Sequence, residues 1–362
     1  MHENPAVQRG PRGYDRPRLL PLLQGAAAFK GVCMKSWIGS RRLAIALAGL
    51  GLLGAVGSVG AQAFPSRQVT LVVPFPPGGG PDVAARVIAE KLAPRLGQPV
   101  VVENRPGAGA LLGASFVAKA AADGHTLLLT PNTMAISPHV LPPGAGGGID
   151  VNRDLVPVIA PATTPLVLVA SPQLGVTNLK GLLEQARKQP GLAYGSPGNG
   201  SPMHFAGEMF KRSSGLDLMH VPYRGVAPSL TAALSGEVKL LYTGVGGALQ
   251  HIKSGKLVPL ALTERTRSSL LPDVPTATEQ GVGNVEVNAW YGVFAPAGTP
   301  AAAIQRINQE INAVIKLPDV RERLIGAGVE PLGGAPQVLA DFMKADTQRY
   351  GQLARELNIK AD

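Results

Sequence analysis

Residues 71–82 read Leu-Val-Val-Pro-Phe-Pro-Pro-Gly-Gly-Gly-Pro-Asp, which is the pattern of an apolar strand, a glycine-rich turn and the start of a helix. Three consecutive glycines, Gly78, Gly79 and Gly80, allow backbone N–H groups to approach a ligand closely. Pro81 suits the first turn of a helix, and a helix N-terminus adds positive potential. The segment therefore predicts an anion-binding loop that contains no Lys or Arg, although a plain tight turn has the same pattern.

Residues 192–202, Leu-Ala-Tyr-Gly-Ser-Pro-Gly-Asn-Gly-Ser-Pro, repeat this order of strand, glycine-rich turn and helix. Ser201 is expected to cap the helix, and Pro202 to occupy its first turn. The two glycine loops are separated by about 120 residues of sequence. We expect one loop in each of two lobes, where the pair would grip the two ends of a small anion.

Short apolar strands alternate with amphipathic helices from residue 68 to about residue 262, and three further helices are expected after residue 300. This alternation predicts an α/β fold of two lobes, each a mostly parallel sheet with flanking helices. Two extended segments containing proline, Val158–Val169 and Val285–Pro300, are placed where a chain would cross twice between lobes. Two ordinary strands of one large sheet would also fit. The expected boundaries are 64–164 with 286–362 for the first lobe, and 165–285 for the second.

The N-terminal region predicts export. Lys35, Arg41 and Arg42 precede an uncharged apolar run at residues 43–59, and Ala61-Gln62-Ala63 is an A-x-A cleavage site. This order is typical of a secretory signal peptide over residues 34–63, with residues 1–33 an upstream start-site extension. An uncleaved membrane anchor is the alternative reading. A cut after Ala63 would release a periplasmic protein.

Removal of residues 1–63 changes the charge of the chain. Eight of its 34 basic and two of its 24 acidic side chains lie in that stretch, so the net charge falls from +10 to +4. The lone cysteine, Cys33, would be removed as well, which excludes a disulfide framework and a cysteine-based zinc ribbon. No basic run with interleaved aromatic residues remains, so nucleic acid is not an expected partner.

The motifs of several enzyme classes are absent from the sequence. It has no phosphate loop ending in Gly-Lys-Ser/Thr, no G-x-S-x-G elbow, no H-E-x-x-H helix and no complete dinucleotide motif. His204 and Glu208 would share a helix face but lack a third metal ligand. Ser196 and Ser201 have no recognisable base, and His220 is one of several scattered histidines. We therefore expect no catalytic residue, no metal and no cofactor.

Further ordered motifs accompany the two glycine loops. They are Phe-Pro-Ser-Arg-Gln-Val-Thr-Leu-Val-Val-Pro-Phe at 64–75, Val-Glu-Asn-Arg-Pro-Gly-Ala-Gly at 102–109, His-Val-Pro-Tyr-Arg-Gly at 220–225, His-Ile-Lys-Ser-Gly-Lys at 251–256 and Leu-Pro-Asp-Val-Pro-Thr at 271–276. With these motifs, residues 64–362 resemble the Bug family, the periplasmic substrate-binding proteins of tripartite tricarboxylate transporters. The resemblance implies two α/β lobes that close on a small organic anion, commonly a carboxylate held by backbone amides and bridging waters.

The resemblance also implies which residues bind the ligand. The expected set is Phe75, Pro76, Gly78, Gly79, Gly80, Asp82, Asn132 and Thr133 in the first lobe, and Ser196, Asn199, Gly200, Ser201, His204, Tyr223 and Thr243 in the second. Many family members have Asp where Thr243 stands, so a ligand carrying an ammonium group is not expected. Residues 131–143 are expected to form a loop.

The implied protein is a monomeric receptor, not an enzyme, that delivers its ligand to the permease subunits of a membrane transporter. A ligand-sensing module for a signalling partner and an exported α/β enzyme are the two alternative readings.

Overall fold

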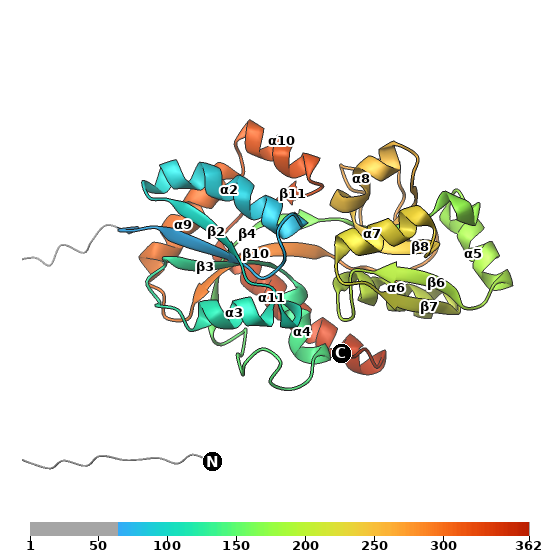
Figure 1. Cartoon of the computed structure of the whole chain (residues 1–362), viewed down its shortest axis with the longest axis horizontal. Coiled ribbons are helices and arrows are strands. Elements are labelled where there is room, and N and C mark those ends of the chain that lie inside the picture. The colour runs from blue at the N-terminus through green and yellow to red at the C-terminus, as the bar shows by residue number, and fades with distance from the viewer. Residues whose placement is uncertain (1–63, 362) are drawn as a thin grey trace, which may run out of the picture. The chain divides into compact units, whose positions relative to one another are not determined.

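The computed structural model describes residues 64–361 and shows two α/β lobes, each built around one sheet (Figure 1). The first sheet has six strands in the order β11-β4-β10-β3-β1-β2, and the second has five in the order β7-β6-β8-β5-β9. The expected two-lobe α/β fold is thereby confirmed. The predicted signal peptide and the extension before it lie outside the described residues.

From its first described strand to the first strand of the second sheet, the chain forms β1 (Val69–Val73), α2 (Gly80–Leu96), β2 (Val100–Asn104), η1 (Ala108–Ala110), α3 (Leu111–Ala118), β3 (Thr126–Pro131), α4 (Thr133–Val140), β4 (Leu155–Thr164) and β5 (Leu166–Ala170). Those of the rest of the second lobe are η2 (Pro172–Leu174), α5 (Leu179–Lys188), β6 (Leu192–Ser196), α6 (Pro202–Ser214), β7 (Leu218–Pro222), α7 (Val226–Ser235), β8 (Leu240–Gly244), α8 (Val245–Lys253) and β9 (Val258–Leu262). The chain ends with β10 (Ala289–Pro296), α9 (Ala301–Val314), α10 (Pro318–Gly326), β11 (Glu330–Pro331) and α11 (Pro336–Glu356).

Both sheets are mixed: in each, most strands run in one direction, as expected, and one or two run against them. β1 runs parallel to β2 and β3, but β10 is antiparallel to both of its neighbours, β3 and β4. In the second sheet β5 is antiparallel to β8 and β9, while β6 is parallel to β7 and β8. β5 and β10 are the strands by which the chain enters each sheet from the other. A helical crossover within one sheet makes the next strand parallel to the previous one. A strand that enters directly from the other sheet is under no such constraint.

The first passage between the sheets is very short. β4 ends at Thr164 in the first sheet and β5 begins at Leu166 in the second, so that only Pro165 separates them. The return runs from the end of β9 at Leu262 to the start of β10 at Ala289. The extended segment Val158–Val169 thus spans the first passage.

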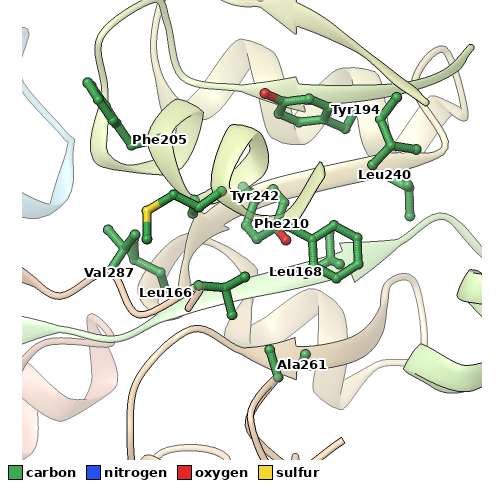
Figure 2. Packing of buried hydrophobic residues seen from close by; sticks show 14 of the residues in the cluster. Leu166, Leu168, Tyr194, Phe205, Phe210, Leu240, Tyr242, Ala261 and Val287 are labelled. Atoms are coloured by element: carbon green, nitrogen blue, oxygen red, sulfur yellow. The ribbon is translucent and has the colours of Figure 1, made fainter. Parts of the chain in front are cut away.

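The core of the second lobe also receives the C-terminal end of the chain. Tyr194, Phe205, Phe210 and Tyr242 are buried together between β6, β8 and α6 (Figure 2). Tyr350 on α11 belongs to the same cluster, and its ring meets that of Phe205 edge-on at 5.0 Å. Each fully buried large side chain of this kind contributes roughly 1.5–3 kcal/mol. α11 therefore spans both lobes.

Residues 133–140 form the helix α4, where the sequence led us to expect a loop. Pro138 lies inside this helix. Proline lacks the N–H that an interior helical position donates, so its presence obscured the helix in the sequence. Among the described residues, no helix is both long and apolar enough to cross a membrane.

Candidate functional site

The first glycine loop joins the carboxyl end of β1 to α2. Gly78 has a φ of +86°, a left-handed conformation that favours glycine, and Gly79 is the extended N-cap of α2. The Gly79 carbonyl accepts the Val83 N–H at 2.9 Å. The first N–H groups of a helix have no partner inside it, and those of Gly79 and Gly80 find none elsewhere in residues 64–361. These two amides are placed to bind an anion.

A single carboxylate holds this loop in shape. Asp82, which is 2% exposed, accepts hydrogen bonds from the Gly78 N–H at 2.9 Å, Arg86 Nε at 3.0 Å and Asn104 Nδ2 at 2.8 Å. The Asn104 amide also donates to the Phe75 carbonyl at 3.0 Å. Both ends of the loop are thus tied to the Asp82–Asn104 pair.

Asp82 is ionised in this setting. Burial raises the pKa of its carboxyl, but the hydrogen bonds from Arg86, Gly78 and Asn104 and the charge of Arg86 outweigh burial, so the net pKa lies below the ordinary value. An ionised carboxylate would repel an anionic ligand. We therefore assign the Asp82 side chain a positioning role. Arg86 was missed in the sequence, although its i,i+4 spacing from Asp82 on a helix was a usable signal.

Asn132 and Thr133 follow β3, the parallel neighbour of β1. The Asn132 side-chain nitrogen donates to the Asn288 carbonyl and to Asp346 Oδ2, both at 2.9 Å. This side chain is therefore bound to α11 and to the residue before β10, and its Oδ1 is buried without a partner among the described residues. Thr133 is the first residue of α4. The end of β3 can therefore contribute to ligand binding through the first turn of that helix.

The second glycine loop joins β6 to α6. Ser201 is the N-cap of α6, with its Oγ accepting the His204 N–H at 3.2 Å and donating to the Gly198 carbonyl at 2.8 Å. Pro202 occupies the first turn, so both sequence predictions for this helix start are confirmed. Gly198 and Gly200 have φ values of +147° and +70°, and Asn199 lies between them.

Two stacked imidazoles support the second loop. The rings of His204 and His220 lie 3.8 Å apart at an angle of 10°. The Gly200 N–H donates to His204 Nδ1 at 3.2 Å, which leaves the imidazole proton on Nε2. His220 Nε2 lies 2.7 Å from Ser196 Oγ. The pair therefore connects strand β7 to both ends of the loop.

Both histidines are neutral at neutral pH. Burial, followed by the nearby charge of Lys211, lowers the pKa of His204 to about 4. Burial and the neighbouring His204 lower the pKa of His220 to about 3. The charge of Glu208 raises the pKa of His220 but is outweighed by burial and His204. Glu208 itself accepts hydrogen bonds from Tyr194 Oη at 2.7 Å and from Lys211 Nζ.

The contact between Ser196 and His220 corrects one expectation. The sequence offered no base for Ser196 and treated His220 as scattered, yet their parallel strands β6 and β7 bring them together. Ser196 is nevertheless 0% exposed, and its Oγ also hydrogen-bonds the Gly198 backbone at 3.2 Å. A hydroxyl in this position is not accessible to a substrate. We therefore assign the Ser196–His220 pair the role of supporting the second glycine loop.

Tyr223 and Thr243 contribute less than their positions suggested. The Tyr223 hydroxyl donates to Glu237 at 2.9 Å, and only its backbone joins the second loop, through a 2.9 Å bond from its N–H to the Ser196 carbonyl. Thr243, near the end of β8, is 0% exposed, and its hydroxyl has no partner in residues 64–361.

The second loop touches the first lobe at Gly200. A β-carbon placed on Gly200 would lie 2.5 Å from a methyl group of Val140, the last residue of α4. Only glycine fits at this contact, because Gly200 combines that close approach with a left-handed φ.

A separate hollow of about 420 Å³ lies between β4, β10 and α11. Its lining includes the apolar side chains of Val151, Leu155, Phe294 and Met343, together with Lys344. None of the loop residues lines it, so it forms no part of the candidate site. No cluster of three or more metal-ligating side chains occurs within the described residues.

Comparison with known proteins gives one consistent family. The family model "Tripartite tricarboxylate transporter family receptor" matches residues 84–359. The UPF0065 protein of the tcbD-tcbE intergenic region of Pseudomonas sp. strain P51 is 40% identical over 330 residues, 90% of this chain and 96% of that protein. Protein BugT of Bordetella pertussis is 36% identical over 324 residues, 89% of this chain and 98% of that protein.

Solved structures of similar proteins share this fold. A Rhodopseudomonas palustris protein with adipate shares 34% identity at a TM-score of 0.76, covering 82% of this chain and 99% of that one. The periplasmic binding protein BugD shares 30% identity at a TM-score of 0.74, covering 83% and 100%. MatC from Rhodopseudomonas palustris with bound malate shares 32% identity at a TM-score of 0.72, covering 80% and 99%.

The Asp82→Asn variant tests the support of the first loop. An amide cannot accept hydrogen bonds from Gly78, Arg86 and Asn104 together, so we expect the free energy of unfolding at pH 7 to fall by about 1–3 kcal/mol. The folded-state pKa of Asp82 is depressed, so this stabilisation is present above pH ~4 and is lost as the pH falls through the folded pKa. Urea unfolding at pH 7 and in acid measures both effects. Asp217→Asn, at an exposed site, is the control, and equal losses in both variants would contradict the assignment.

The histidine pair predicts a pH dependence of stability. Unfolded histidine titrates near pH 6.5, whereas His204 and His220 titrate near pH 4 and 3 when folded. Unfolding therefore takes up protons in this window, and its free energy falls on acidification by up to about 1.4 kcal/mol per pH unit for each histidine. His220→Gln should lower that slope in urea unfolding between pH 7 and 4, while His251→Gln on α8 should not. A wild-type slope in His220→Gln would refute the prediction.

Proposed function

The chain belongs to the family of tripartite tricarboxylate transporter receptors, and from that premise we propose that it is a periplasmic receptor for a small organic carboxylate. The resemblance carried by the sequence motifs is confirmed at the level of the family. We further propose that the receptor delivers its ligand, as a monomer, to the permease subunits of a tripartite transporter.

One observation carries the proposal: each lobe presents a glycine loop at the start of a helix, on the carboxyl side of its sheet. In the first loop the amides of Gly79 and Gly80 lack acceptors among the described residues, and no Lys or Arg lies in residues 75–80. Backbone amides at a helix start bind a carboxylate without a charged side chain. Adipate and malate, seen with two similar proteins, each carry two carboxylates, one for each loop.

Ligand binding would bring the two loops together. The contact of Gly200 with Val140 supports a closed arrangement in which the second loop faces the first lobe. A ligand that touches both loops binds this arrangement more tightly than a separated one, and so shifts the population toward it. The closed form would be the one that the permease recognises.

The site favours binding over catalysis. Ser196, the one hydroxyl within hydrogen-bond distance of an imidazole in the described second loop, is fully buried. The His204 and His220 imidazoles are neutral and committed to the loop. We therefore propose that the protein has no enzymatic activity.

The Gly79→Val variant tests the anion-binding loop. Gly79 has a φ of −79°, which any residue adopts, and a β-carbon there would meet nothing closer than 3.9 Å, so the fold should tolerate valine. The branched side chain would nevertheless cover the neighbouring amides. We expect malate and adipate to raise the free energy of unfolding of the wild type by about 2.7 kcal/mol at 100 times the dissociation constant. In Gly79→Val that increase should disappear.

Thermal unfolding with and without each acid measures the effect. Gly283→Val, at an open glycine outside the loops, is the matched control and should bind as the wild type does. The dimethyl ester of each acid should give no shift, because it has no carboxylate. Unchanged affinity in Gly79→Val would contradict the loop assignment, and the lack of any shift in the wild type across dicarboxylates would overturn the carboxylate proposal.

Export predicts a defined N-terminus. If the signal peptide is cut after Ala63, protein recovered from the periplasm should begin Phe64-Pro65-Ser66 on N-terminal sequencing. Replacing Ala61 and Ala63 with bulky residues should block the cut and leave a larger, membrane-associated form. Recovery of an intact residue 1 in the exported protein would refute this prediction.

A further inference from the structure

The start of α8 and the turn before β11 lie at the sheet edges that carry the two glycine loops. β8 is parallel to β6, so α8, which follows β8, starts at the same edge of the second sheet as the second glycine loop. β10 is antiparallel to both β3 and β4, so β4 runs in the direction of β1 and β3. Glu330, the first residue of β11, pairs with Thr163 next to the end of β4. The turn before β11 therefore shares its edge of the first sheet with the first glycine loop.

These two edges meet backbone to backbone. A β-carbon on Gly246, the second residue of α8, would overlap the Ala327 carbonyl oxygen. A β-carbon on Gly328 would overlap Gly246 itself. The Gly328 carbonyl is fixed in the first lobe, because it accepts a hydrogen bond from Thr164 Oγ1, at the end of β4, at 3.3 Å. No side chain therefore separates the two lobes at the Gly246–Gly328 contact.

Three side chains clamp the same turn to the second lobe. Ser268 Oγ and Ser269 Oγ both donate to Glu330 Oε1, at 2.7 and 2.9 Å. Glu330 belongs to the first sheet, whereas the serines lie in the segment after β9, which packs with α8 and β5 in one hydrophobic cluster. Ser268 is 4% exposed, so its hydrogen bond is shielded from water. This Glu330 clamp, formed by Glu330, Ser268 and Ser269, holds the turn before β11 against the second lobe.

We propose that the Gly246–Gly328 contact is a specificity determinant that sets the length of the dicarboxylate that the receptor accepts. The proposal rests on the proposed carboxylate-receptor function, in which one ligand touches both glycine loops. The edges that carry the loops touch here and at Gly200 with Val140, so these contacts fix the distance between the loops. With glycine on both sides, the approach at Gly246 is limited by the backbones alone, and the Glu330 clamp holds it there. A side chain at this contact would move the loops apart and favour a longer ligand.

Gly246→Ala tests the contact with a single methyl group. Gly246 is helical, and alanine is favoured over glycine in a helix, so the substitution does not weaken α8 itself. Succinate, glutarate and adipate separate their carboxylates by two, three and four methylene groups. We expect the ratio of adipate affinity to succinate affinity to rise about tenfold over that of the wild type, the lower end of what one methylene group contributes in a fitted site.

Two further variants isolate the role of spacing. Gly181→Ala in α5 is the matched control, since its β-carbon would meet no atom closer than 3.5 Å, and it should keep the wild-type ratio. Glu330→Ala removes the acceptor of both serine hydroxyls without adding bulk. One hydrogen bond corresponds to about a fivefold change in an equilibrium constant, so this variant should bind all three acids about fivefold more weakly. Their ratio should stay unchanged, because loosening the contact does not lengthen it.

Calorimetric titration of each acid gives the affinities, and energy transfer gives the distance between the lobes. Residues 64–362 contain no cysteine, so one dye can be attached to a cysteine introduced on α2 and the other to one on α7. Gly246→Ala should shift this distance to larger values with and without ligand. A merely structural change within α8 would leave the distance and the affinity ratio as they are in the wild type.

The double variant Gly246→Ala/Glu330→Ala covers the case in which Gly246→Ala alone is too unstable to titrate. Without the Glu330 clamp the lobes are free to separate and accommodate the methyl group. The double variant should therefore fold, and the raised ratio of adipate affinity to succinate affinity should remain.

The outcomes separate this proposal from the proposed function. If the wild type binds none of the three acids, the proposed function fails, and the dye distance without ligand still decides the contact: an increase in Gly246→Ala supports it, and no change overturns it. If the wild type binds, a wild-type affinity ratio in both Gly246→Ala and the double variant overturns the proposal. An equal loss of affinity for all three acids in those variants would overturn it as well.

Discussion

A glycine loop can bind an anion through its backbone only if something else holds the backbone still. Glycine has more conformational freedom than any other residue, so the loop at residues 75–80 is ordered at a high entropic cost. The buried Asp82 carboxylate offsets that cost through three hydrogen bonds, and Arg86 balances its charge. The backbone of the second loop is held by the neutral imidazoles of His204 and His220. An ionised side chain therefore supports the first loop, and uncharged side chains support the second.

Much of the fold could be predicted from the sequence, because strand, glycine turn and helix follow each other locally. The cap at Ser201 and the first turn at Pro202 are confirmed on this basis. The antiparallel entry of β5 and β10 was missed, because the hydrophobic pattern of a buried strand carries no information on its direction. α4 was missed because Pro138 is a poor helix former, and the packing of that helix against α11 decides its structure.

Less of the candidate site could be predicted. The glycine positions were visible, since a backbone that must adopt a positive φ, as at Gly78 and Gly200, selects glycine. The side chains that support the loops were harder to find, because they come from distant segments. Asn104 meets Asp82 across 22 residues, and His220 meets Ser196 across 24. The motifs around Asn104 and His220 contributed to the family resemblance, but spacing alone did not reveal what these residues contact.

The order of strands also constrains the order of folding. All strands of the second sheet come from one continuous stretch, residues 166–262, whereas β10 lies between β3 and β4 in the first sheet. The first sheet therefore cannot close until more than 120 residues after β4 have emerged. Contacts of long sequence separation form late and slowly. An emerging chain would complete its second sheet first, and would leave the facing edges of β3 and β4 open to chaperones until β10 arrives.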